Sequence, residues 1–207
     1  FTYKKLKEKL TVSDSKKLFH EKFPYVIPGL YKRIVDEMLV ELNLLNHQSE
    51  FNQDYLFCVG LTETFDELMK GYEPKKHLDL LFDSLCSCTN FKAEEIKEIS
   101  KNSQKEYKDK SSKDIFKLLK EKNNSKLYPS RILNLGMYIL ISNSQDLKEN
   151  NDSDIDKITS DIFEKLHLSA NKAEKDIGIY KSSISKMEQA KELIEELRIK
   201  DKKRNQK

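Results

Sequence analysis

Residues 28–47, PGLYKRIVDEMLVELNLLNH, are the stretch that decides how this chain folds. Between Leu30 and Leu45 there is no glycine or proline, and apolar side chains recur every three or four residues. This spacing is typical of an α-helix with a broad apolar face, and Pro28 suits its first turn because no N–H is needed there. About sixteen residues form a rod of roughly 24 Å. Several other helices are needed to cover such a face, so we expect a core helix.

The composition favours an all-α fold, a single helical-bundle globule. The chain has 207 residues but only 5 glycines and 4 prolines, too few to supply the turns of many β-hairpins. Charged residues make up 35% of the chain, and the mean hydropathy is −0.72. The net charge of +3 gives no overall signature of nucleic-acid binding. No run of eighteen apolar residues is present, so we expect no membrane-spanning helix.

Further helices are expected from the same periodicity, separated by turn residues. We expect Ser13 to cap a first short helix that stops near Phe23, since Pro24 restricts the residue before it. Gly60 is expected to allow close helix packing, and Gly71 to end the helix that contains it. The further helices are expected at about 13–23, 53–70, 74–86, 93–105, 111–119, 129–142 and 155–166. The apolar stretch 129–142 is predicted to pack on the helix of 28–47, whereas residues 1–10 form a basic arm and 145–154 a polar loop.

The last segment differs from the rest. Ser169 can cap a helix that continues without proline to about Lys200, roughly 45 Å if unbroken. Its apolar residues follow the three- and four-residue steps of a coiled-coil seam and form only a narrow stripe. We therefore divide the chain into a helical globular domain, 1–168, and a long, partly coiled-coil-like C-terminal helix with a basic tail, 169–207. We expect this helix to project or to pair with another surface.

The sequence contains no recognisable catalytic constellation, and we predict no catalytic residue, no cofactor and no metal site. Cys86 and Cys88 point roughly 200° apart on a helix, so they cannot share a metal ion. Together with Cys58 they form an odd set in apolar surroundings, which indicates buried thiols in a reducing compartment. The basic termini leave two alternatives open, contact with anionic lipid headgroups and a helical module that binds nucleic acid.

Five stretches, read in order, carry a resemblance to one family. They are TVSDSKKLFHEKFP (11–24), LYKRIVDEMLVELNLLN (30–46), FDELMKGYEP (65–74), YPSRILNLGMY (128–138) and EKDIGIYKSSISKMEQAKE (174–192). Together they resemble the Thylakoid Formation family, the photosystem II biogenesis factors of cyanobacteria and plastids. The resemblance runs in register from about Thr11 to Lys203.

The resemblance implies a non-enzymatic accessory protein for photosystem II biogenesis and repair and for thylakoid membrane formation. Its implied partners are an FtsH-type thylakoid protease, which it stabilises or helps to assemble, and photosystem II assembly intermediates; no nucleic acid is expected. The implied location is the cytoplasmic side of the thylakoid membrane, bound peripherally, with a basic C-terminus available for contact with the membrane. For a mature plastid form, the location is the stroma or the thylakoid.

Five residues in the matched stretches are predicted to bind a partner. They are Tyr128, Arg131, Lys175, Asp176 and Tyr180. Arginine and tyrosine are over-represented among the residues that carry interface binding energy. The alternative for each residue is a structural role, such as an ion pair of Asp176 with Lys172 or packing of Tyr180 in the core.

Overall fold

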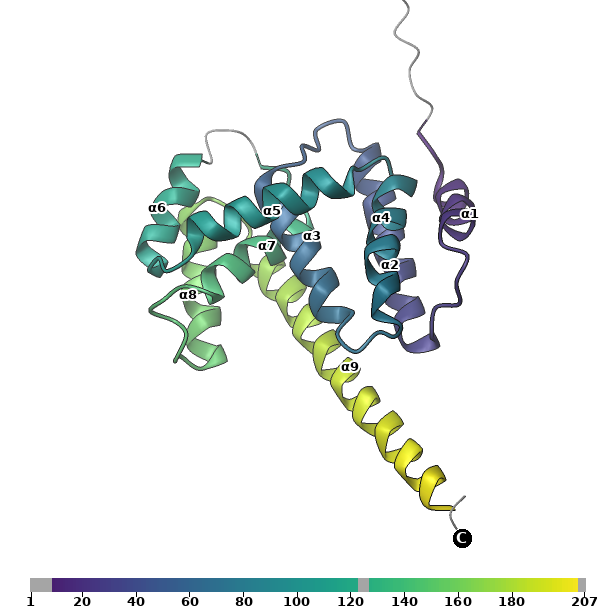
Figure 1. Ribbon diagram of the computed structural model, residues 1–207. Coiled ribbons are helices and arrows are strands. Elements are labelled where there is room, and N and C mark those ends of the chain that lie inside the picture. Colours follow the sequence, from purple (N-terminus) through teal and green to yellow (C-terminus); the bar gives the residue numbers. More distant parts are fainter. Residues whose placement is uncertain (1–8, 123–126, 205–207) are drawn as a thin grey trace, which may run out of the picture. The chain divides into compact units, whose positions relative to one another are not determined.

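A computed structural model describes residues 9–122 and 127–204, the side chains of residues 198 and 201–204 excepted. Every regular element in these ranges is a helix, which confirms the all-α class. The elements in Figure 1 are α1 (Val12–Lys22), α2 (Gly29–His47), α3 (Tyr55–Leu68), a 3-10 turn (Lys75–His77), α4 (Leu78–Cys88), α5 (Ala93–Tyr107), α6 (Ser112–Lys122), α7 (Arg131–Ser142), α8 (Asp152–Lys165) and α9 (Ala170–Arg204). Residues 1–8 of the basic arm and residues 205–207 of the basic tail lie outside the described residues.

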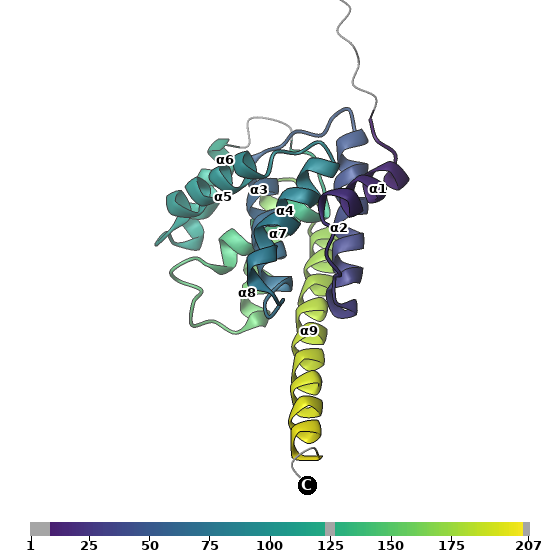
Figure 2. The same cartoon turned by 45° about the vertical axis from the view of Figure 1, so that its right-hand side comes forward.

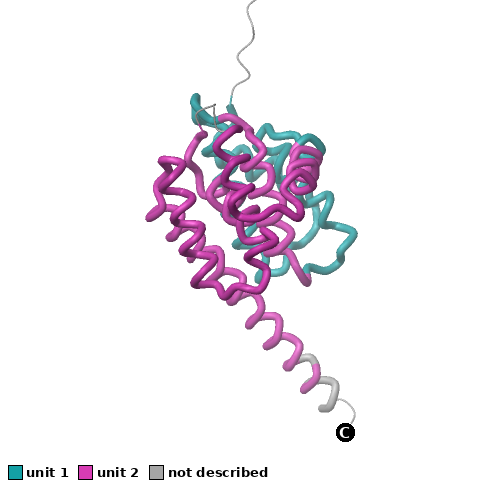
Figure 3. Tube along the Cα trace, turned by 90° about the vertical axis from the view of Figure 1, so that its left-hand side faces the viewer, with its two compact units in different colours: residues 1–51, 72–95 teal, residues 52–71, 96–207 magenta. Residues whose placement is uncertain are grey.

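The chain divides into two compact units, coloured separately in Figure 3. Unit 1 comprises residues 1–51 and 72–95, and unit 2 comprises residues 52–71 and 96–207. This partition places the long C-terminal helix in the same unit as α3, α6, α7 and α8. The sequence analysis placed a boundary between residues 168 and 169 to separate a globular part from a long helix. The division into compact units does not test that boundary, which stays a prediction.

Unit 1 is built from α1, α2 and α4, joined by a buried chain of hydrogen bonds. Asn43 of α2 donates from Nδ2 to Ser15 Oγ at 2.8 Å, and this hydroxyl donates to the carbonyl of Cys88 at 2.8 Å. The apolar face of α2 is buried as its spacing predicted, through Tyr31, Val35, Met38, Leu39, Leu42 and Leu45. The same face carries one polar residue, Asn43, which no apolar pattern would place there.

Two predicted helix starts in unit 1 are wrong by one or two residues. The cap of α1 is Thr11, not Ser13, because Thr11 and Asp14 satisfy each other's backbone N–H groups in a capping box. Pro28 lies just before α2 with extended backbone (φ −54°, ψ 140°) and is not in its first turn. The end of the first helix at Lys22, with Phe23 as C-cap, is as predicted.

Unit 2 is organised around the crossing of α3 and α7, the closest helix pair in the described chain (Figures 1 and 2). A Cβ atom built on Gly60 would lie 2.0 Å from the carbonyl oxygen of Ile132, and one on Gly136 would lie 2.0 Å from that of Leu56. The two backbones therefore meet directly, as Gly60 led us to expect. Within unit 2, α7 packs most extensively on α3. The expected packing of the stretch 129–142 on the helix of 28–47 joins the two units and stays a prediction.

The remaining helices of unit 2 enclose this pair. Buried apolar residues of α6, α8 and the first half of α9 join those of α7 in one cluster, including Ile115, Phe163 and Ile177. The ends of the elements follow local chemistry. Gly71 has a φ of 83° after α3, and Ser111 Oγ accepts the N–H of Asp114 at the start of α6 at 3.2 Å.

Candidate functional site

The first half of α9 is fixed to α7 by a partly buried hydrogen bond. Asn134, only 5% exposed, donates from Nδ2 to Oδ2 of Asp176 at 2.8 Å. This bond joins residues 42 positions apart in the sequence. Asp176 thus accepts a hydrogen bond from an amide on another helix. The sequence analysis had given an ion pair with Lys172 as its possible structural role.

A second set of contacts holds α9 to α8. Lys181 of α9 forms ion pairs with Asp156 at 2.9 Å and with Asp152 at 3.5 Å, and its ammonium lies 5.4 Å from the centre of the Tyr138 ring. Burial lowers the pKa of Lys181, but the hydrogen bond and the charge of Asp156 outweigh it, so the net shift is upward. The sequence analysis missed this group because its members belong to three helices.

The predicted partner-binding residues occupy different environments. Lys175 is exposed on α9, whereas Asp176 and Tyr180 are partly buried against the neighbouring helices. Burial, followed by the negative charge of Glu67, raises the pKa of the Tyr180 hydroxyl. Tyr128 and Arg131 are also partly buried; Tyr128 precedes α7, and Arg131 is its first residue, one turn before Asn134, which bonds Asp176. Their role in partner binding stays a prediction.

The second half of α9 extends beyond the other helices of unit 2 (Figures 1 and 3). Met187 is still buried, at 6% exposed, but Leu193, Ile194 and Leu197 are 58%, 41% and 52% exposed. At about 100° per residue, these three side chains lie within about 100° of one another around α9, and Ile194 is nearly in line with Met187, while Ile199 falls on the side of the helix opposite the three. The three side chains therefore form an apolar face that is exposed on the part of α9 beyond the other helices of unit 2.

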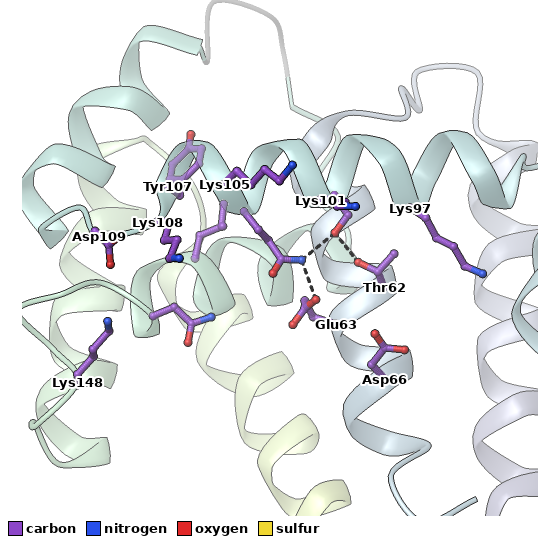
Figure 4. Close-up of a pocket in the computed structure, with 14 residues that line it drawn as sticks. Thr62, Glu63, Asp66, Lys97, Lys101, Lys105, Tyr107, Lys108, Asp109 and Lys148 are labelled. Atoms are coloured by element: carbon purple, nitrogen blue, oxygen red, sulfur yellow. Dashed lines mark hydrogen bonds between the residues drawn. The ribbon is translucent and has the colours of Figure 1, made fainter. Parts of the chain in front are cut away.

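A groove of about 610 Å³ lies between α3, α5 and the end of α7 (Figure 4). Five lysines line it: Lys97, Lys101, Lys105, Lys108 and Lys148. Three carboxylates also line it: Glu63, Asp66 and Asp109. The sequence analysis did not identify this groove, because three lysines of α5 and Lys108 just after it, at three- and four-residue spacing, do not stand out in a chain with 35% charged residues.

The floor of the groove is a closed set of hydrogen bonds, drawn as dashed lines in Figure 4. Gln104 donates to Glu63 Oε1 at 2.7 Å and to Ser100 Oγ at 3.1 Å. Ser100 Oγ lies 2.6 Å from Thr62 Oγ1, which donates to the carbonyl of Cys58 at 2.9 Å. Since the hydroxyl of Thr62 is used in this way, Ser100 donates to Thr62. The floor donors are therefore occupied, and the unused donors of the groove are mainly its ammonium groups.

Other kinds of site were considered within the described residues. No group of three or more histidine, cysteine, aspartate or glutamate side chains there is arranged to hold a metal ion. Cys58, Cys86 and Cys88 are buried and form no disulfide. Among the described helices, none combines the length and the apolar character that crossing a membrane requires.

Comparison with known proteins decides the family. The sequence model of the thylakoid formation protein family matches residues 11–207. The chain belongs to this family. It is 83% identical over 199 residues to Protein Thf1 of Prochlorococcus marinus strain MIT 9312, covering 96% of this chain and 99% of that protein. It is 69% identical over 202 residues to Protein Thf1 of strain CCMP1986, covering 98% of this chain and all of that protein.

The fold of the family is also confirmed by a solved structure. The structure of Psb29 matches 96% of this chain and all of its own chain, with a TM-score of 0.84 at 26% sequence identity. The thylakoid formation protein family acts in thylakoid formation and photosystem II biogenesis, so this is the process in which its members, this chain included, take part. The resemblance carried by the five sequence stretches is thus confirmed.

Proposed function

We propose that this chain is a non-enzymatic accessory protein that supports photosystem II biogenesis and repair by binding an FtsH-type membrane protease of the thylakoid. The single observation that carries the mode of action is the apolar face of Leu193, Ile194 and Leu197 on α9. An exposed apolar face on a helix is typical of a surface that another helix or groove covers. The first half of α9 is anchored to α7 through Asn134, and its second half, called the arm below, extends beyond the other helices of unit 2.

The proposed location is peripheral, at the cytoplasmic side of the thylakoid membrane. Family membership supports the thylakoid, and none of the described helices has both the length and the apolar character needed to cross a membrane. Photosystem II assembly intermediates are proposed as further partners that reach the chain through the protease. The nucleic-acid alternative rests on the two basic termini, parts of which lie outside the described residues. A salt titration of binding to random duplex DNA tests it, since phosphate contacts give a steep loss of affinity with salt.

The interface is tested by removing the apolar character of the arm without disturbing its helix. Leu193→Gln with Leu197→Gln keeps good helix formers at two exposed positions, so the free energy of unfolding should change little. Full-length wild-type and variant chains, tagged alike, are used to retrieve the protease from detergent-solubilised cyanobacterial thylakoids. A half-exposed leucine contributes on the order of 1 kcal/mol when a partner covers it, so the double variant should bind roughly tenfold to a hundredfold more weakly.

Ile199→Gln is the matched control. It makes a similar chemical change on the same arm, at 45% exposed, but on the opposite side of the helix. This variant should retrieve the protease as well as the wild type does. Equal retrieval by all three chains would refute the proposed contact. Normal protease abundance and photosystem II recovery under strong light in a strain that carries only the double variant would refute the mode of action.

A further inference from the structure

Four of the five lysines of the groove are not neutralised by an ion pair. Other lysines of the chain are paired with an acid one turn away, as in Lys32–Asp36 at 3.0 Å and Lys165–Asp161 at 2.5 Å. Within the described residues no carboxylate lies within ion-pair distance of Lys101, Lys105, Lys108 or Lys148. The groove therefore presents positive charge that the fold itself does not use.

The arrangement of these lysines has a cost. Lys101 has a lysine one turn before it and another one turn after it, so α5 carries a row of like charges. Each such pair destabilises a helix by about 0.2–0.5 kcal/mol. Lys105 and Lys108 lie at the C-terminal end of α5, where a cation offsets the partial negative charge of the helix terminus. That explanation does not extend to Lys101, in the middle of the helix, or to Lys148, on the segment after α7.

The carboxylates that line the groove do not cancel this charge. Glu63 is occupied by the amide of Gln104, and Asp66 has an interaction of its own. Asp109 follows α5 in the left-handed conformation, with a φ of 59°, and lies near Lys108 at one end of the groove. Figure 4 shows Lys148 rising from the segment below toward this same end. Five lysines against three carboxylates leave a net charge of +2 on the lining.

We propose that this groove binds a phosphate group. Lysine ammonium groups are compact point charges that bind phosphate oxygens well, and here they come from two separate segments that line one groove. The donors on the floor are occupied, so the ammonium groups are the main donors left for a ligand. A volume of about 610 Å³ admits a phosphorylated small molecule or a lipid headgroup and is too large for a single ordered water. The inference goes beyond the proposed function, which uses a different part of unit 2.

Two sources supply this chemistry, a soluble phosphorylated molecule and an anionic phospholipid headgroup, and two probes separate them. The full-length chain is titrated with inorganic pyrophosphate by calorimetry at low salt. It is also floated with vesicles of phosphatidylcholine alone and of phosphatidylcholine with phosphatidylglycerol in equal parts. Binding of pyrophosphate identifies a soluble ligand. Flotation with the vesicles that contain phosphatidylglycerol, but not with those of phosphatidylcholine alone, identifies a lipid headgroup.

The test variant is Lys101→Gln with Lys148→Gln. Both side chains are exposed, so the fold should be kept, and binding should weaken about thirtyfold, which corresponds to about 2 kcal/mol. Lys113→Gln with Lys120→Gln is the matched control, because it removes the same charge from exposed positions on α6 in the same unit. Asp109→Asn removes a negative charge from the groove and keeps a residue type that tolerates the left-handed conformation, so it should tighten binding severalfold.

Three results would overturn the proposal. In the first, neither probe binds the wild-type chain. In the second, the α6 control loses as much affinity as the groove variant, so the binding is only diffuse charge attraction. In the third, the chain binds polyglutamate but neither phosphate probe, and the groove would then be a contact for an acidic protein surface.

Discussion

The contact between α3 and α7 leads to a prediction about stability that can be worked from distances. A Cβ atom on Gly60 would lie 2.0 Å from the carbonyl oxygen of Ile132 and 2.9 Å from the backbone nitrogen of Gly136. Ordinary contacts of this kind begin at 3.4 Å, so the distance from the new Cβ atom of Gly60→Ala to this oxygen is about 1.4 Å too small. The atoms that block it are backbone atoms of a helix and cannot turn aside as a flexible side chain would. The two helices must therefore move apart.

The expected magnitude follows from what that movement breaks. A gap of 0.5–1 Å already loses about a quarter to a half of the dispersion energy between the facing atoms. Both helices are buried along nearly their whole length, so many contacts are affected together. Overpacking of a core costs about 1–3 kcal/mol, and the rigid backbone places this site at the upper end. Alanine in place of glycine returns up to about 1 kcal/mol by helix propensity, which leaves a net loss of about 2–3 kcal/mol.

This loss is measured as a change in the free energy of unfolding, from urea unfolding curves followed by the helix signal in circular dichroism at 222 nm. Gly178→Ala is the matched control, because it makes the same change inside α9 where nothing lies within 4 Å of the new atom. That variant should gain about 0.5–1 kcal/mol. A Gly60→Ala protein as stable as the wild type would refute the reasoning. So would full additivity with Gly136→Ala, because once the helices have separated, the second alanine meets less resistance.

Three further predictions concern single contacts. Asn134→Ala removes the donor to the partly buried Asp176 and should lower the free energy of unfolding by about 1–3 kcal/mol in the same assay. Burial raises the pKa of Asp146, but hydrogen bonds from Ser112 outweigh it, so the net pKa of this carboxyl is lowered. The carboxylate therefore stabilises the fold above its unfolded pKa of about 4, and this stabilisation is lost as the pH falls through the lower pKa of the folded state. Asp146→Asn should therefore be less stable than wild type at pH 7, with the difference shrinking in urea titrations below about pH 4. Burial raises the pKa of the Cys88 thiol, so a thiol reagent at pH 8 should label it only in unfolded protein; rapid labelling of the native chain would contradict the buried position.

Much of the fold could be predicted from local patterns, because the determinants are local. The Phe23 stop before Pro24, the cap formed by Ser111 and Asp114, and Gly71 after α3 each act within one turn of the chain. The error at the first helix was also local, since Thr11 offers the same capping chemistry as Ser13 but has Asp14 three residues ahead.

The pairing of helices was harder to predict, because periodicity shows that a face is buried without showing which element covers it. The signal for α3 with α7 was nevertheless present. Gly60 and Gly136 are the glycines inside the two most apolar helices, and each lets the other's backbone approach. Reading them as a reciprocal pair would have predicted the crossing. By contrast, nothing in the sequence joins Lys101 to Lys148, which line one groove only because of the positions of α5 and the segment after α7.

The same packing explains how stability and function can be separated in this protein. The crossing at Gly60 brings α7 close to α3, and α7 in turn holds the first half of α9 through Asn134. A variant at that anchor should lose partner binding only to the extent that it unfolds. Leu193→Gln with Leu197→Gln should lose partner binding while its unfolding curve is unchanged, because both side chains are exposed. If binding instead followed stability in every variant, the apolar face of the arm would not be the contact, and the binding surface would have to lie on the packed part of unit 2.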